Sequence, residues 1–223
     1  MEARLQHIPT NLITGYLGAG KTTAILGLLA RRPKGERWAV LVNDFGQADI
    51  AGADFSGPGA EGVTVSKVAA GCICCTAKVN LRVALMQLLR KARPQRLLIE
   101  PAGLAHPAAV IDTLRDPWLA EALDLRAVIC IADPRQFAGP LPAATETYLD
   151  QLALADVIVA SKADLATPAQ LQALLDYARA LIPPKLRVLP ARNGEFPLEW
   201  LDLAPASRGP LAAQKIPEIT SAA

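Results

Sequence analysis

Two short stretches hold most of the residues that could do chemistry in this chain. Residues Gly15 to Thr22 read Gly-Tyr-Leu-Gly-Ala-Gly-Lys-Thr, which has the spacing of a phosphate-binding loop. Residues Gly71 to Cys75 read Gly-Cys-Ile-Cys-Cys and hold three of the four cysteines. Backbone amides of such a loop bind phosphates, and thiolates suit soft metals. The sequence therefore predicts a nucleotide site and a thiolate site in one chain.

The predicted phosphate loop follows a strand-like run and opens a helix-like run, the context that separates it from a chance match. A Gly-rich turn that merely caps a helix is the alternative. Lys21 would neutralise the β and γ oxygens of a nucleotide, and Thr22 would reach Mg²⁺. Thr23 extends the first helical turn or touches the α-phosphate. We expect the loop to bind nucleotide through Gly15, Gly18, Ala19, Gly20, Lys21, Thr22 and Thr23.

Two further motifs follow strand-like runs. Glu100 ends one run, and Gly103 lies three residues later, so a carboxylate and a flexible backbone N–H would approach the γ-phosphate. Glu100 would hold a water of Mg²⁺ or orient the attacking water, or it caps the next turn. The second motif is Ser161 to Asp164, in which Asp164 could accept two hydrogens from guanine, favouring GTP over ATP. The same four residues are also an ordinary helix start.

The three clustered cysteines predict a metal site. Once deprotonated, Cys72, Cys74 and Cys75 suit Zn²⁺ or Cu⁺ far better than Mg²⁺. Adjacent ligands need a bent backbone, and a fourth position would stay open to water, Asp44 or His106. The alternative is three buried core cysteines. The fourth cysteine, Cys130, lies in an apolar run and is expected to be an inert core thiol.

The composition is that of a globular protein, with 223 residues of which 52% are hydrophobic and 20% charged. We expect one domain over residues 1–203 and a disordered tail over 204–223. A net charge of +2 without a long single-sign run argues against a nucleic-acid or membrane surface. No apolar run approaches the roughly 18 residues that span a membrane. We therefore expect a cytoplasmic protein.

Short apolar runs alternate with helical patterns, which predicts an α/β fold with a mostly parallel sheet flanked by helices. Ligands of such sheets bind at the carboxyl ends of the strands, where the motifs above fall. The long segment from Asn43 to Gly62 is expected to be a mobile switch loop. The expected strands are 8–14, 38–42, 63–68, 96–100, 127–132, 156–161 and 185–190. The expected helices are 21–32, 81–93, 146–155 and 168–182, with a terminal helix near Trp200.

The order of these motifs, with Asn-Asp-Phe-Gly at 43–46, resembles the CobW-like metallochaperone GTPases from about Ile8 to Arg192. The resemblance implies a P-loop NTPase fold of the SIMIBI type, Mg²⁺-dependent GTP hydrolysis and a transition-metal cargo, often zinc or cobalt. It also implies a metal-requiring acceptor protein and frequent nucleotide-linked dimerisation. Carried over by position, the resemblance implies that Lys21 and Thr22 hold phosphate and Mg²⁺, that Glu100 and Gly103 sense the γ-phosphate, and that Lys162 and Asp164 read guanine.

Several positions depart from the family pattern. Ser161 replaces the usual asparagine, so contacts to guanine and to the phosphate loop are expected to be lost. Ala51 stands where the family has a switch aspartate, which leaves Asp49 or Asp54 to substitute and favours slow hydrolysis. Asp44 takes the place of a switch glutamate, and Asp133 matches a family position but equally suits a cap before Pro134. We also expect the usual C-terminal domain to be absent; the only histidines are His7 and His106.

The leading interpretation is therefore a GTP-hydrolysing metallochaperone with zinc as the favoured cargo. A second interpretation is a nucleotide-gated metal-binding regulatory module with little hydrolysis. A third is a P-loop ATPase or kinase whose cysteines are incidental. In the leading interpretation, GTP orders the switch loop and alters the geometry of the thiolates.

Overall fold

The structure is a computed structural model, and it describes residues 6–43, 61–68, 77–137 and 145–206. Its eight strands form one sheet in which every pair of neighbours is parallel. The strands are β1 (Ile8–Thr14), β2 (Trp38–Asn43), β3 (Val63–Val68), β4 (Arg96–Glu100), β5 (Leu123–Leu125), β6 (Ile129–Ala132), β7 (Val157–Ala160) and β8 (Arg187–Pro190). Their order is β3-β2-β4-β1-β6-β7-β8, and β5 pairs with the beginning of β1. The prediction of a mostly parallel sheet is confirmed.

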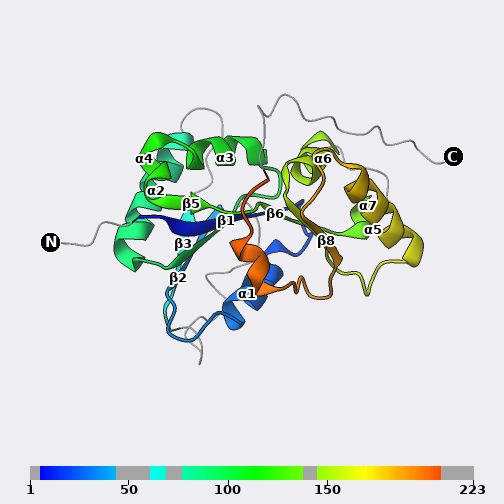
Figure 1. Ribbon diagram of the computed structural model, residues 1–223, viewed down its shortest axis with the longest axis horizontal. Helices are drawn as coiled ribbons and strands as arrows, with labels where there is room; N and C mark the ends of the chain where they lie inside the picture. The colour runs from blue at the N-terminus through cyan, green and yellow to red at the C-terminus, as the bar shows by residue number, and fades with distance from the viewer. Residues whose placement is uncertain (1–5, 44–60, 69–76, 138–144, 207–223) are drawn as a thin grey trace.

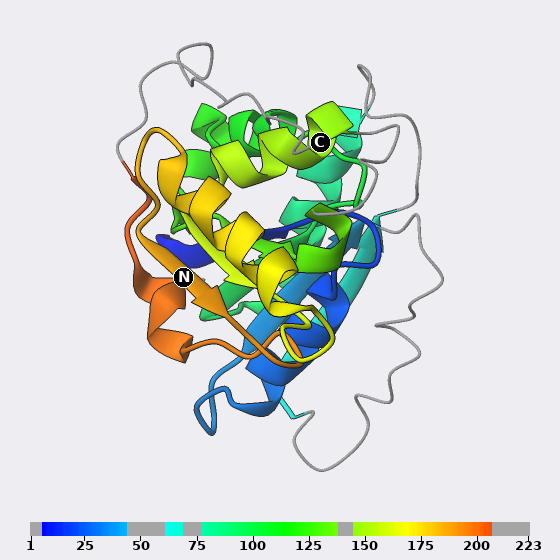
Figure 2. The same cartoon turned by 90° about the vertical axis from the view of Figure 1, so that its right-hand side faces the viewer.

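Helices cover both faces of the sheet. They are α1 (Lys21–Ala30), α2 (Ala77–Ala92), α3 (Pro107–Leu114), α4 (Pro117–Ala120), α5 (Pro134–Phe137), α6 (Thr145–Leu154), α7 (Pro168–Ala180) and a 3-10 helix (Leu198–Asp202). The helix α1 and the 3-10 helix lie on one face, whereas α2, α3 and α6 lie on the other (Figure 1). Figure 2 shows α7 running beside β8 at one end of the sheet.

The core is made by strands that are buried on both faces. In β4, Leu98 packs toward α1, whereas Leu97 and Ile99 pack toward α2 and α3. In β7, Val159 belongs to the α1 side and Ile158 to the side of α6 and α7. Alternate residues of a strand point to opposite faces, so both sets are apolar and the sequence shows a continuous apolar run. Each fully buried side chain of this kind contributes roughly 1.5–3 kcal/mol to folding.

The predicted helices form, with shifts at their ends. The helix α7 begins with a capping box between Thr167 and Gln170 and ends at Ala180, two residues before the expected end. Leu181 is already extended there, and the prolines at 183 and 184 disfavour helix in the residues before them. The helix α2 begins at Ala77, one turn before the first leucine from which the prediction started.

The segment after β8 returns across the α1 face and is tied to the sheet. The amide of Asn11, fully buried on β1, donates to the carbonyls of Ala127 and Leu201 at 3.1 Å each. Trp200 is partly buried and packs against the core on the α1 side, which confirms docking through Trp200, and its ring stacks on that of Phe196 with centroids 6.1 Å apart. Ala206, the last described residue, donates its backbone N–H to Asp156 at 3.1 Å. Of the helices described, none is both long and apolar enough to cross a bilayer.

Candidate nucleotide site at the carboxyl edge of the sheet

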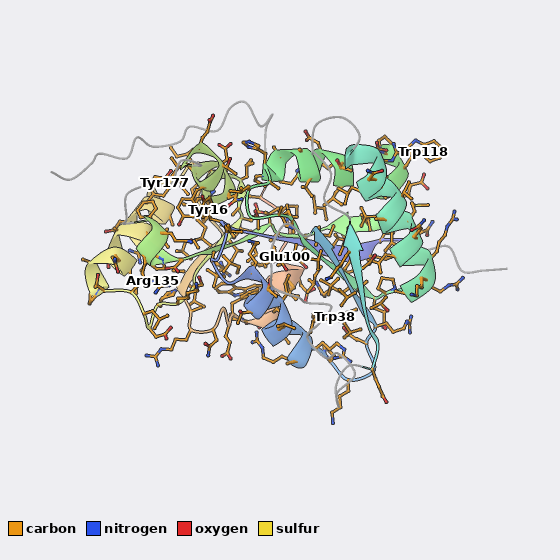
Figure 3. All side chains as sticks on the ribbon, turned by 180° about the vertical axis from the view of Figure 1, so that it is seen from behind. Tyr16, Trp38, Glu100, Trp118, Arg135 and Tyr177 are labelled. Carbon is orange, nitrogen blue, oxygen red and sulfur yellow. The ribbon has the colours of Figure 1, made fainter. Side chains whose placement is uncertain are left out.

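Four separate segments meet at one edge of the sheet. The strands β4, β1, β6 and β7 are adjacent and parallel, so their carboxyl ends lie side by side. The residues that follow these ends are Pro101, Gly15, Asp133 and Ser161. The structure therefore brings together the motifs that the sequence placed far apart. Figure 3 shows Glu100, at the end of β4, near the middle of the molecule and beside α1.

The loop after β1 requires glycine at its two ends. A β-carbon on Gly15 would stand 2.1 Å from the carbonyl oxygen of Ile131 on β6, and its φ of +144° disfavours other residues. Gly20 has a left-handed φ of +100° and occupies the cap position of α1. Glycine has no side chain to accept from the first amides of that helix. Those amides are therefore available to an anion, as phosphate binding requires.

Two carbonyls of this loop accept hydrogen bonds from side chains that follow β7. The hydroxyl of Ser161 lies 2.6 Å from the carbonyl oxygen of Ala19, and Nζ of Lys162 donates to that of Gly18 at 2.6 Å. The expected loss of the contact between residue 161 and the phosphate loop is therefore wrong. Serine is shorter than asparagine, but its hydroxyl is fully buried beside the loop and reaches the carbonyl directly.

The two preceding carbonyls are held in the same manner. Lys21 donates from Nζ to the carbonyl of Tyr16 at 3.2 Å, and Gln136 of α5 donates from Nε2 to that of Leu17 at 2.8 Å. Side chains thus donate to four successive carbonyls of the loop, and the carbonyl of Tyr16 also accepts from the backbone N–H of Ala19 at 3.2 Å. These contacts fix the shape of the loop.

A cation, a hydroxyl and a carboxylate lie together at the start of α1. Lys21 is 7% exposed, and burial lowers the pKa of its ammonium group, while the charge of Glu100 acts in the opposite direction. Thr22 donates from its hydroxyl to Oε1 of Glu100 at 3.0 Å. The structure therefore brings three predicted site residues together, whereas Thr23 points to an exposed part of the helix surface.

Gly103 lies directly against the phosphate loop. A β-carbon at this position would stand 2.8 Å from the backbone nitrogen of Leu17 and 3.2 Å from Nζ of Lys21. Both distances are shorter than an ordinary carbon contact, so the position excludes a side chain. The backbone of the turn after β4 therefore approaches the loop at the place where the sequence predicted a γ-phosphate contact.

Asp133 links the segments after β6 and β7. Its carboxylate is 2% exposed, accepts from Nε and Nη2 of Arg135 at 3.0 and 2.7 Å, and lies 3.4 Å from Nζ of Lys162. Burial raises the pKa of Asp133, but the bonds from Arg135 and the charge of Lys162 outweigh it and hold the pKa below its usual value. Asp133 also accepts from the backbone N–H of Arg135, which confirms its capping role. Asp164 is exposed at the end of the same motif.

The predicted cargo-metal ligands lie outside the described residues. These are Cys72, Cys74, Cys75 and Asp44, together with the switch positions Asp49, Ala51 and Asp54. In the part of the chain that the structure describes, no three His, Cys, Asp or Glu side chains are grouped to hold a metal. His106 lies 3.5 Å from the carboxylate of Asp150. Cys130 is fully buried, and burial raises its pKa to about 12, which confirms a core thiol.

Three residues of the site were missed from the sequence. Gln136 and Arg135 follow Asp133 within one turn, and no sequence pattern singles them out. Gln151 of α6 is fully buried and donates to the carbonyl of Gly103 at 3.0 Å. A signal existed for Gln151, because it is a polar residue on the apolar face that Tyr148 and Leu152 define.

A family model for the CobW/HypB/UreG nucleotide-binding domain matches residues 9–189 of the chain. The chain belongs to this family. Two relatives within it are the zinc chaperone YeiR of Escherichia coli K12 and the zinc chaperone CobW of a Sinorhizobium species. YeiR is 49% identical over 165 residues, which is 74% of this chain and 49% of YeiR. CobW is 32% identical over 213 residues, which is 84% of this chain and 60% of CobW.

Solved structures agree with the CobW/HypB/UreG assignment at the level of the fold. The crystal structure of Zn(II)-bound YjiA GTPase from E. coli matches with a TM-score of 0.57 at 24% identity. The match covers 82% of this chain and 56% of that one. The expected P-loop NTPase fold is therefore confirmed. The chain spans about half to three fifths of the length of these three proteins.

Proposed function

We propose that this chain is the GTP-hydrolysing domain of a zinc chaperone, which couples GTP binding and hydrolysis to transfer of zinc to an acceptor protein. The contact between Thr22 and Glu100, at 3.0 Å beside the buried Lys21, carries the proposal. A lone Gly-rich turn would need neither a buried cation nor a carboxylate at its helix start. Family membership and two relatives named as zinc chaperones support the direction of the assignment.

The nucleotide would be bound by the loop from Gly15 to Thr22 and by the motif after β7. Amides of the loop and the ammonium group of Lys21 bind the β- and γ-phosphates. Gly103 donates its backbone N–H to the γ-phosphate. Lys162 and Asp164 bind the guanine, since a carboxylate accepts the two adjacent N–H hydrogens that guanine offers and adenine lacks.

Magnesium fits the same place. The hydroxyl of Thr22 and the carboxylate of Glu100 are hard oxygen donors, and they already lie within 3.0 Å of each other beside the loop. When bound, Mg²⁺ neutralises charge that develops on the phosphoryl oxygens. Glu100, whose side chain is 7% exposed, orients the attacking water.

Replacing Glu100 by Gln is expected to slow single-turnover GTP hydrolysis by about 100-fold, with affinity for a non-hydrolysable GTP analogue kept within about fivefold. Glutamine retains an oxygen to accept from Thr22 but loses the charge that orients water. Rapid-quench kinetics and titration with a fluorescent analogue measure the two quantities. Glu199→Gln, an exposed change on the 3-10 helix, serves as the control. Hydrolysis at the wild-type rate in Glu100→Gln would rule out this role, and no turnover in the wild type would favour the regulatory module.

Zinc binding should require the three clustered cysteines. Serine at Cys72, Cys74 and Cys75 is expected to abolish zinc binding in a competition assay with a chromophoric chelator, because a hydroxyl is a poor zinc ligand at neutral pH. Cys130→Ala, in the core, should bind zinc as the wild type does.

In the wild type, zinc affinity should differ by about tenfold between GDP and a GTP analogue, and by linkage zinc must change the affinity for GTP equally. Equal zinc affinity with both nucleotides would contradict coupling.

A further inference from the structure

Helix α6 holds the turn after β4 through one fully buried side chain. Gln151 donates from Nε2 to the carbonyl of Gly103 at 3.0 Å and to that of Ala105 at 3.3 Å. An amide nitrogen carries two hydrogens, so both bonds form together. The orientation of the amide is fixed, because its oxygen in the same place would face two carbonyl oxygens.

The turn itself fixes the direction of one N–H group. Ala105 donates its backbone N–H to the carbonyl of Ala102 at 2.8 Å, so that carbonyl points into the turn. The same planar, trans peptide carries the N–H of Gly103, which therefore points the opposite way. Gln151 holds the carbonyls at 103 and 105, and the backbone nitrogen of Leu17 in the phosphate loop lies 2.8 Å from a β-carbon built on Gly103.

The same helix also contacts the phosphate loop. The rings of Tyr148 on α6 and Tyr16 in the loop meet edge to face with centroids 5.7 Å apart. Asp150 on α6 lies 3.5 Å from the ring of His106, just after the turn. The helix α6 therefore contacts both the phosphate loop and the turn after β4.

An apolar side chain at position 151 would pack without the cost of burying an amide. The oxygen Oε1 of Gln151 is buried and has no hydrogen-bond partner in the described part of the chain. Burying such a group is unfavourable, so packing alone does not account for glutamine on this face. The two bonds to the turn are what the amide provides.

We propose that Gln151 is a positioning residue for recognition of the γ-phosphate. By holding the turn on both sides of residue 104, it keeps the N–H of Gly103 directed toward the bound phosphate. This inference rests on the proposed function, in which Gly103 contacts the γ-phosphate of GTP. GDP has no γ-phosphate, so losing Gln151 should weaken binding of GTP selectively.

The test replaces Gln151 by Met, which has a similar length and no donor. With Mg²⁺ present, affinity for a non-hydrolysable GTP analogue is expected to fall about tenfold, while affinity for GDP stays within about twofold. Single-turnover hydrolysis should slow in the same variant. Gln172→Met, on the exposed surface of α7, controls for the substitution itself.

An equal loss for both nucleotides, or a loss for neither, would overturn the role of Gln151. Gln151→Leu is the second variant if the methionine protein does not fold, as judged by circular dichroism. Failure of the wild type to bind GTP would instead contradict the proposed function. A wild type that binds and hydrolyses GTP, beside a variant with unchanged preference between the two nucleotides, would overturn the positioning role alone.

Discussion

Replacing Lys21 by Met is expected to reduce GTP hydrolysis by about 1000-fold and to weaken GTP binding strongly. Lys21 is the buried cation of the site, and the nearby carboxylate of Glu100 favours its charged form. Without Lys21, the negative charges of the phosphates and of Glu100 would face each other with no ammonium group to compensate them. Turnover of GTP and calorimetric titration with a GTP analogue measure the two effects.

The fold should survive this substitution. Methionine has a similar shape and removes the burial of an ammonium group, but it also leaves Glu100 without its neighbouring cation and the carbonyl of Tyr16 without one donor. These effects oppose each other, so the midpoint of thermal unfolding is expected to change by only a few degrees. Lys34→Met, at an exposed position after α1, should leave hydrolysis unchanged. Hydrolysis by Lys21→Met within tenfold of the wild type would show that the phosphates are bound elsewhere.

Replacing Gly15 by Ala is expected to cost at least about 4 kcal/mol of the free energy of unfolding, from backbone strain and steric overlap together. The β-carbon would stand 2.1 Å from the carbonyl oxygen of Ile131 at a φ of +144°. A backbone atom in the middle of a buried sheet cannot move aside as a flexible side chain could. Urea unfolding followed by circular dichroism measures the loss.

A matched glycine-to-alanine substitution inside α1 is expected to change the free energy of unfolding in the opposite direction. Gly27, inside α1, has nothing within 4 Å of a built β-carbon, and its φ is ordinary. Gly27→Ala should therefore stabilise the protein by about 0.5–1 kcal/mol, as alanine does inside a helix. A loss below about 1 kcal/mol in Gly15→Ala would mean that the loop does not lie against β6 as described.

Local sequence patterns were enough to predict the sheet and the position of the phosphate loop. Strands buried on both faces produce continuous apolar runs, and the loop motif is short and contiguous. The three-residue strand β5 and the four-residue helices α4 and α5 are too short to show a period. Their positions follow from packing against elements far away in the chain.

The contacts around the loop could not be predicted in the same way. Ser161 and Ala19 are 142 residues apart in sequence, and Gln136 and Leu17 are 119 apart. A hydrogen bond from a side chain to a distant carbonyl depends on strand order and on the length of the side chain, and neither leaves a local pattern. The sequence therefore predicted that residue 161 would lose its contact with the phosphate loop, whereas in the folded chain Ser161 makes this contact directly.

The four carbonyl contacts of the phosphate loop also bear on how fast nucleotides exchange. Their donors, at 21, 136, 161 and 162, belong to the protein itself, so the loop has its shape before a ligand arrives. A preorganised receptor gives up little conformational entropy on binding. As far as this loop is concerned, exchange of one nucleotide for another is then limited by departure of the first, because the phosphate loop does not have to refold to receive the second.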